Sequence, residues 1–102
     1  MYLVVFRSRK RADLDAAAYA VDADEMKALA LAQPGLLAVK TYANEDGETV
    51  SLSEWADEAA AREWGRNAEH AVMQRRGKER YYASYTIFSC ADPRIREFGT
   101  ML

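Results

Sequence analysis

The feature that most constrains the fold of this chain is the order in which strand-like and helix-like segments follow one another. Residues 2–9 are rich in β-branched and aromatic side chains, which favour a strand. Residues 14–33 are almost all good helix formers, and we expect Asp13 to cap the first turn of this helix. The helix ends at Pro34 and Gly35, because proline cannot continue a helix and glycine adopts backbone conformations that other residues resist.

A hairpin, a second helix and a last strand complete the order. An Asp-Gly turn at residues 46–47 separates two strand-like runs at residues 36–43 and 49–55. Asp57 is placed to cap a second helix, and residues 81–90 are dense in aromatic and β-branched side chains. The order β-α-β-β-α-β predicts an α+β domain of the ferredoxin-like class, with a four-stranded antiparallel sheet.

Composition narrows the classes of function. The 102 residues fit one domain, which we place at residues 1–91, followed by a tail at residues 92–102. The net charge of −2 argues against nucleic acid or an acidic membrane surface as a partner. The apolar run at residues 1–6 is too short for a signal peptide or a membrane span, and a single cysteine excludes an internal disulfide. Both observations favour a cytoplasmic protein.

Several kinds of site are missing from the sequence. No cluster of cysteine and histidine has the spacing of metal ligands, and no glycine-rich phosphate loop is present. Cys90 has no adjacent base, so we expect it to be an inert core residue. The third strand, residues 49–55, lacks the basic and aromatic motif that RNA-binding domains with this strand order carry.

Side-chain alternation gives the sheet two apolar faces. Leu3 and Val5 alternate with Tyr2, Val4 and Phe6 in the first strand, and Tyr81, Tyr85 and Ile87 oppose Tyr82 and Phe88 in the fourth. In the third strand, Val50 and Leu52 point one way and Ser51 and Ser53 the other. Two helices cover only one face of a four-stranded sheet, so the other face needs a second layer. We therefore expect a homodimer that packs sheet against sheet.

His70, the only histidine, is the first candidate for chemistry. Its ordinary pKa of about 6.5 suits a general base near neutral pH. On one continuous helix it lies about 120° around the axis from Trp64, so the two share a face only if the helix breaks near residues 66–68. Asn67 and Gln74 lie on the same helix face as His70.

The other candidates have both a packing and a ligand-binding interpretation. Trp64 and Phe6 either fill the core or form the wall of a pocket. Arg7 needs an anionic partner if it points inward, and otherwise marks the exposed end of its strand. Tyr82 and Tyr85 either pack within their strand or donate hydrogen bonds to a substrate carbonyl.

Several local motifs occur together along residues 2–91. They are Val4-Val5-Phe6-Arg7-Ser8, Tyr19…Met26…Leu29-Ala30, Gln33-Pro34-Gly35-Leu36-Leu37, Ser53-Glu54-Trp55 and Trp64…Glu69-His70…Gln74…Gly77…Tyr82. In this combination the sequence resembles the antibiotic biosynthesis monooxygenase superfamily, whose members are small dimeric α+β barrels.

The resemblance implies a monooxygenase that oxidises a small aromatic or quinone-like substrate with molecular oxygen and without a cofactor. In that chemistry the enolate or phenolate of the substrate reduces oxygen, while the protein orients, deprotonates and desolvates it. The expected site has His70 as base or hydrogen-bond partner, Trp64 and Phe6 as pocket walls, Arg7 beside an oxyanion, and Asn67, Tyr82 and Tyr85 against the substrate.

Two alternatives stay open. A haem-degrading branch of the superfamily has a tryptophan at the position of Trp64, but the asparagine of its first strand is missing here, and its histidine lies further along the helix than His70. The second alternative is a dimeric module of the same fold that binds a small ligand without catalysis.

Overall fold

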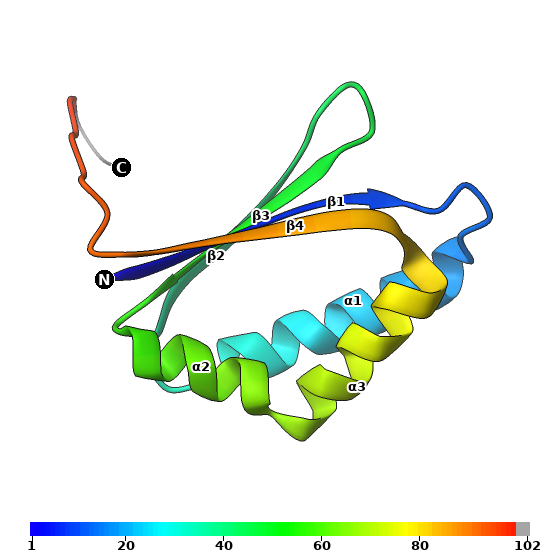
Figure 1. Ribbon diagram of the computed structural model, residues 1–102, viewed down its shortest axis with the longest axis horizontal. Coiled ribbons are helices and arrows are strands. Elements are labelled where there is room, and N and C mark those ends of the chain that lie inside the picture. The colour runs from blue at the N-terminus through cyan, green and yellow to red at the C-terminus, as the bar shows by residue number, and fades with distance from the viewer. Residues whose placement is uncertain (100–102) are drawn as a thin grey trace.

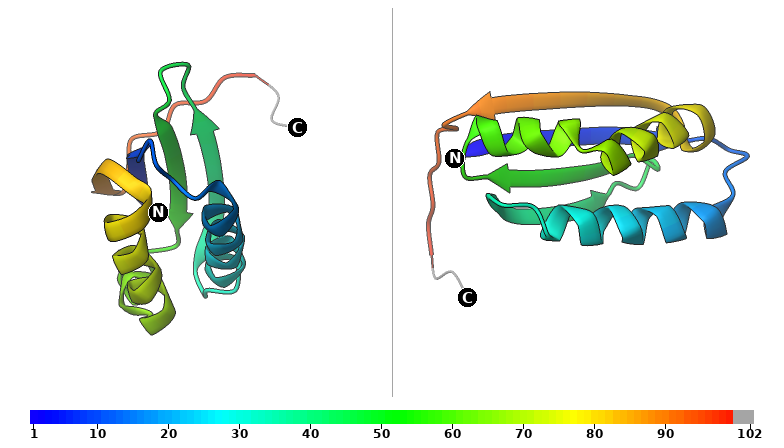
Figure 2. Two further views of the ribbon diagram at one scale, coloured as in Figure 1. Left: turned by 90° about the vertical axis from the view of Figure 1, so that its right-hand side faces the viewer. Right: turned by 90° about the horizontal axis from the view of Figure 1, so that it is seen from below.

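The computed structural model describes residues 1–99, apart from the side chains of residues 68, 69, 72 and 73. Its elements are β1 (Tyr2–Lys10), α1 (Ala16–Leu31), β2 (Leu36–Ala43), β3 (Thr49–Trp55), α2 (Glu58–Arg66), α3 (Ala68–Arg76), the π-helical segment η1 (Gly77–Tyr81) and β4 (Tyr82–Ala91). The strands pair in the order β2-β3-β1-β4, and every pair is antiparallel. The helices lie on one side of this sheet (Figures 1 and 2), which confirms the ferredoxin-like class. None of the described helices is long and apolar enough to cross a lipid bilayer.

One of the two predicted helix caps is correct. The carboxylate of Asp57 accepts a hydrogen bond from the backbone N–H of Ala60 at 2.8 Å, and so caps α2. The cap of α1 is Asp15, because the carboxylate of Asp13 is held by two hydrogen bonds of 2.8 Å from the Arg11 guanidinium. The prediction of Asp13 was therefore wrong by two residues.

The pairing of β1 with β3 fixes which side of the sheet each side chain faces. Tyr2 lies opposite Trp55, so both point to the same side. That side carries the helices, because Trp55 is 1% exposed and its ring stacks on Trp64 of α2. Alternation then turns Val50 and Leu52 to the helix-free side and the serines of β3 toward the helices. The helices thus cover the more polar side of β3.

A β-bulge decides the side on which Tyr82 lies. The register between β1 and β4 shifts at Arg9, so that Tyr82 pairs with Lys10. The Tyr82 ring therefore contacts Phe6 on the helix side, whereas alternation alone had grouped it with Phe88. The predicted grouping was wrong because period-two alternation does not anticipate an extra residue in one strand.

The tail leaves the sheet at a turn beside the N-terminus. Asp92 has a positive φ of 47°, its backbone N–H donates to the Met1 carbonyl at 2.8 Å, and its carboxylate pairs with the Met1 ammonium at 3.2 Å. From there the tail runs away from the helices (Figure 1), with Ile95 and Phe98 exposed. Residues 100–102 of the predicted tail lie outside the described residues.

Gly35 and Gly47 allow a matched test of how closely α2 packs against Gly35. Both have positive φ, 85° and 90°, but a Cβ on Gly35 would lie 2.6 Å from the Cβ of Ala60, while a Cβ on Gly47 meets nothing within 4 Å. Gly47→Ala should lower the free energy of unfolding by about 1 kcal/mol, the cost of the left-handed conformation. Gly35→Ala should lower it by about 2–4 kcal/mol, because overpacking adds to that cost. Urea denaturation of both variants measures the difference, and equal losses would contradict the close packing of Gly35.

Candidate functional site

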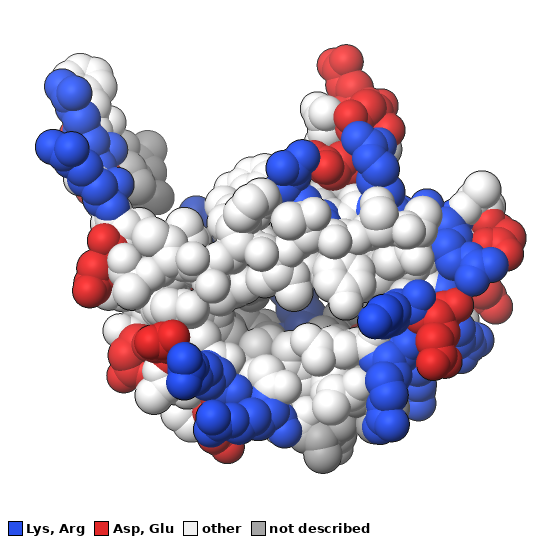
Figure 3. All heavy atoms as spheres, in the orientation of Figure 1, with Lys and Arg blue, Asp and Glu red and all other residues white. Residues whose placement is uncertain are grey.

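The space between the sheet and the helices is only partly filled. Tyr85 and Ile87 pair with Ser8 and Phe6 and so point toward the helices, yet they are 43% and 51% exposed. The accessible surface of the chain is 7469 Å², whereas a compact monomer of this mass exposes about 5,800 Å². Figure 3 shows the surface hollowed between β4 and the helices beneath it. A cleft of this kind is where a small-molecule site is expected.

Three rings stack in a column along one wall of this space. Trp55 stacks on Trp64 with ring centroids 6.3 Å apart, and Trp64 stacks on His70 with centroids 3.9 Å apart and an angle of 23° between the planes. The column exists because the helical region breaks at Asn67, whose ψ of 128° separates α2 from α3. The predicted condition for Trp64 and His70 to meet, a break near residues 66–68, is therefore fulfilled.

The break also fixes the backbone around the histidine. The side-chain oxygen of Asn67 accepts a hydrogen bond from the backbone N–H of His70 at 3.3 Å, which is the contact of a helix cap. Asn67 was expected to contact a substrate, and the structure gives it this capping contact beside His70. Glu69, which belongs to the same motif, has a side chain outside the described part of the chain.

The hydrogen bonds of His70 determine which ring nitrogen is available for chemistry. Nδ1 lies 2.8 Å from the backbone carbonyl oxygen of Trp64, and since a carbonyl only accepts, Nδ1–H is the donor. In the neutral ring Nε2 then carries the lone pair. Burial lowers the pKa of His70, and the hydrogen bond to Trp64 opposes that shift only in part. At neutral pH the ring is a neutral base with a defined tautomer.

Aromatic side chains form a second wall. The Phe6 ring lies 5.4 Å from the rings of both Tyr82 and Tyr85, and Tyr82 lies 6.4 Å from Tyr19 of α1. Burial raises the pKa of Tyr82, so its hydroxyl stays protonated and able to donate. The structure thus brings Phe6, Tyr82 and Tyr85 together in one aromatic cluster.

A surface depression joins α3 and η1 to β4. It has a volume of about 360 Å³ and is lined by Ala71, Gln74, Arg75, Lys78 and Tyr85. Gln74 lies one helical turn after His70, on the same face. The depression therefore leads from the surface toward Tyr85 and the aromatic wall, with two cationic side chains on its rim.

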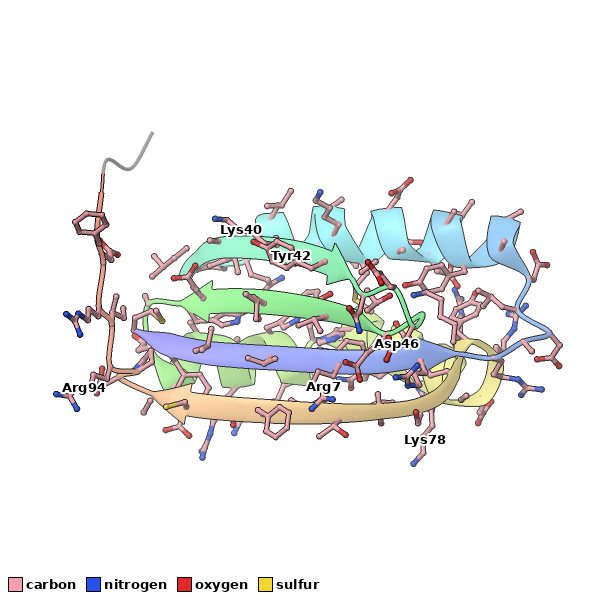
Figure 4. All side chains as sticks on the ribbon, turned by 90° about the horizontal axis from the view of Figure 1, so that it is seen from above. Arg7, Lys40, Tyr42, Asp46, Lys78 and Arg94 are labelled. Carbon is pink, nitrogen blue, oxygen red and sulfur yellow. The ribbon has the colours of Figure 1, made fainter. Side chains whose placement is uncertain are left out.

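Arg7 lies on the other face of the sheet. Its guanidinium donates two hydrogen bonds to Glu48, at 3.1 and 3.4 Å, and sits 5.9 Å from the centre of the Phe88 ring (Figure 4). Alternation along β1 separates it from Phe6, so within one chain Arg7 is not brought together with His70 and Trp64. Of the two interpretations of Arg7, the exposed one applies, and the anionic partner that was expected for an inward arginine is present as well, in Glu48.

Cys90 also lies on the helix-free face, opposite Leu3, and is exposed. The prediction that it is a core residue was wrong for the single chain, because its strand is covered on the other side only. Among the described residues, no group of three His, Cys, Asp or Glu side chains is placed to hold a metal ion.

Sequence reasoning missed Lys10 as a candidate. The side chain of Lys10 points toward the helices, donates to the Thr49 hydroxyl at 3.1 Å and lies 5.0 Å from the centre of the Tyr19 ring. In the sequence it was hidden in the basic run of residues 7–11. The sequence signal that could have pointed to Lys10 was the alternation of Val50 and Leu52 with serines. This alternation predicts that one side of β3 is polar.

Comparison with known proteins identifies the relatives of this chain. A sequence model described as antibiotic biosynthesis monooxygenase matches residues 1–76. The chain belongs to this family. The uncharacterised protein YqjZ of Bacillus subtilis (strain 168) is 31% identical over 86 residues, which cover 84% of this chain and 74% of YqjZ. The resemblance noted in the sequence is thereby confirmed.

Solved structures support the same fold for this family member. Rv0793 from Mycobacterium tuberculosis superimposes with a TM-score of 0.79 at 20% identity, covering 94% of this chain and 98% of its own. SnoaB, a cofactor-independent oxygenase from Streptomyces nogalater, superimposes with a TM-score of 0.75 at 15% identity, covering 94% and 97%. At these identities the comparison establishes the fold, and the chemistry has to be argued from the site.

The lowered pKa of His70 makes stability depend on pH in a defined direction. The unfolded chain takes up a proton near pH 6.5, while the folded chain takes it up only at lower pH, so the free energy of unfolding should fall as pH drops from 7 through 6.5 toward the folded pKa. Urea denaturation at pH 7.0 and 5.5 should show this loss in the natural chain and a smaller loss in His70→Gln. An equal loss in both chains would show that His70 is not the group responsible.

Proposed function

We propose that the protein is a cofactor-independent monooxygenase that oxidises a small, electron-rich aromatic or quinone-like substrate with molecular oxygen. Membership of the antibiotic biosynthesis monooxygenase family supports the reaction class. The observation that carries the proposal is the state of His70, a half-buried histidine whose Nδ1–H is held by the Trp64 carbonyl while Nε2 keeps its lone pair. A base with that arrangement beside an aromatic-lined cleft suits proton abstraction from a phenol or an activated ring methylene.

The reaction balances with substrate and oxygen alone. His70 Nε2 takes a proton from a ring methylene next to a carbonyl, and the resulting enolate passes one electron to O₂. The substrate radical and superoxide combine to form a C–O bond, and the peroxide regains the proton from His70. Loss of water with the second methylene hydrogen leaves a carbonyl. One oxygen atom enters the product, the other leaves as water, and the substrate supplies all the electrons.

The other side chains of the cleft position the substrate. The Trp64 ring holds the His70 ring at a fixed tilt, so that Nε2 keeps one direction. Phe6 and Tyr85 offer apolar surface on which an aromatic ring packs, and the Tyr82 hydroxyl is a protonated donor. Arg7 has no part in this site of the same chain because it lies on the opposite face. The desolvating walls raise the reactivity of an anionic substrate.

The haem alternative makes a different use of the same nitrogen. Nε2 of His70 has the lone pair that an axial haem ligand needs, but one face of the ring is covered by Trp64 at 3.9 Å. Titration with haem separates the two functions, because ligation by His70 would give a Soret shift that His70→Ala abolishes.

We also propose that the working form is a homodimer joined through the helix-free face. Val5 of the central strand lies between Leu52 and Phe88 on that face, and Phe88 is 49% exposed. A row of apolar side chains of this kind, in a chain with more accessible surface than a compact monomer, is typical of an interface. Figure 4 looks onto this face, with Arg7, Lys40 and Tyr42 around the apolar row.

The role of His70 is tested by oxygen consumption with anthrones and hydroquinones as substrates. His70→Ala should lower kcat/KM by about 10²–10⁴-fold, the usual contribution of a general base. Arg62→Gln, an exposed change on α2, is the control and should leave the rate unchanged. Unchanged oxygen uptake in His70→Ala would remove this residue from the mechanism. Binding without turnover in the natural chain would favour the non-catalytic module.

The dimer is tested by sedimentation velocity at micromolar concentration. Phe88→Glu places a charge in the apolar row and should shift the protein from dimer to monomer, because burying a carboxylate in an apolar interface is costly. Val21→Glu, at an exposed apolar position on the outside of α1, should leave the dimer intact. A natural chain that sediments as a monomer would refute the proposal directly.

A further inference from the structure

The basic run of residues 7–11 contains three arginines that are neutralised within the chain. Arg7 pairs with Glu48 at 3.1 Å, Arg9 with Asp46 at 2.7 Å, and Arg11 with Asp13 at 2.8 Å. All three guanidinium groups are exposed, and Arg7 and Arg9 hold the tip of the β2–β3 hairpin on the helix-free side. Each of these three positive charges is therefore neutralised by a carboxylate of the same chain.

Lys10, in the same run, is in a different situation. Its side chain points to the helix side and is half-buried, and its contacts are the Thr49 hydroxyl at 3.1 Å and the face of the Tyr19 ring at 5.0 Å. None of the ion pairs within the described residues includes Lys10. An ammonium carries three N–H donors, and only one is used by Thr49. A half-buried cation with neutral partners only is unfavourable unless an anion completes it.

The floor of the chamber around Lys10 is lined with hydroxyls. The helix-facing residues that carry hydroxyls are Ser8 of β1, Thr49, Ser51 and Ser53 of β3, and Thr41 of β2, and they alternate with apolar neighbours such as Val4, Phe6 and Val39. Ser8 is buried, and the Ser53 hydroxyl accepts a hydrogen bond from the Trp55 indole N–H at 3.0 Å. Thr41 and Ser51 hydrogen-bond to each other at 3.1 Å and stay accessible. A sheet face under helices is normally apolar, because its burial is what holds the two layers together. This one is partly polar, and its accessible hydroxyls, Thr41 and Ser51, can meet oxygen-rich groups of a ligand.

The hydroxyl floor is continuous with the aromatic wall. Lys10 pairs with Tyr82 across the β1–β4 ladder, and the Tyr82 ring contacts Phe6. Phe6 lies four residues before Lys10 on the same side of β1, a distance of about 13 Å along the strand. Because Tyr82 is the cross-strand partner of Lys10, an aromatic ring that packs at the Tyr82 end of this wall presents a ring substituent to Lys10.

We infer that Lys10 and Thr49 bind an oxyanion, a carboxylate above all, carried by the aromatic ligand of the cleft. The aromatic nature of that ligand rests on the proposed function, whereas the anionic substituent is assigned from Lys10. The ammonium donates its free N–H groups to the carboxylate, the Thr49 hydroxyl holds the ammonium in place, and the Tyr19 ring stabilises the charge from one side. The substrate class is thereby narrowed to acidic aromatics.

Equilibrium binding to a charged and a neutral probe tests the inference. Calorimetry compares 1-naphthoate with 1-naphthylmethanol, which have the same ring system and differ in charge. The natural chain should bind 1-naphthoate more tightly. Lys10→Met should weaken 1-naphthoate at least about tenfold and leave 1-naphthylmethanol within twofold, since a hydrogen bond to a charged group is lost. Lys10→Arg, which keeps the charge, should retain most of the affinity.

Two further variants keep the test decisive. Lys27→Met removes an exposed lysine on α1 and should leave both affinities unchanged. Thr49→Val leaves the cation and removes the hydroxyl that orients it, and should weaken 1-naphthoate about threefold even if Lys10→Met does not fold. Equal effects of Lys10→Met and Lys27→Met, no effect of Thr49→Val, or no preference for 1-naphthoate in the natural chain would overturn the inference.

The binding test is independent of the oxygenase test. If His70→Ala consumes oxygen at the natural rate while Lys10→Met loses 1-naphthoate, the proposed chemistry of His70 fails and anion recognition stands. If His70→Ala loses activity while Lys10→Met binds 1-naphthoate normally, the chemistry stands and the inference about Lys10 fails.

Discussion

The pairing register of β1, the central strand, is the constraint on which the rest of the structure depends. It pairs with β3 on one side and β4 on the other, so it sets the direction of every side chain in three strands at once. A slip of one residue would exchange the two faces. The present register places Trp55 and Phe6 under the helices and Val5 away from them. It thereby decides which side chains line the cleft and which form the apolar row.

The second decisive feature is the break between α2 and α3. Continuous helix would leave Trp64 and His70 pointing in different directions, and the bend at Asn67 brings their rings to 3.9 Å. At this bend the Trp64 carbonyl accepts from the Asn67 backbone N–H at 3.2 Å and from His70 Nδ1–H at 2.8 Å, and the second hydrogen bond fixes the tautomer of His70. A local departure from regular structure thus sets both the position and the tautomer of the His70 ring.

The sequence predicted what depends on local patterns and missed what depends on tertiary packing. The order of elements, the Asp-Gly hairpin and the Asp57 cap follow from propensity and turn chemistry, and the structure has them. Alternation separated Val50 and Leu52 from the serines, but only the pairing with β1 tells which set meets the helices. Tyr82 was misplaced because of a bulge, and Lys10 was overlooked because its partners, Thr49 and Tyr19, are distant in sequence. For His70, the helical spacing showed that contact with Trp64 requires a break in the helix, but it did not show whether the helix breaks.

The hydroxyl-lined side of the sheet has a consequence for how such a protein changes over time. Side chains such as Ser51 and Thr41 bury little apolar surface, so exchanging them alters the shape and polarity of the chamber while the ladder hydrogen bonds and the apolar row on the opposite face stay as they are. The apolar row and these hydroxyls thus lie on opposite sides of one thin layer. A scaffold divided in this way accepts new specificities with small losses of stability, which suits a fold that hosts many different activities.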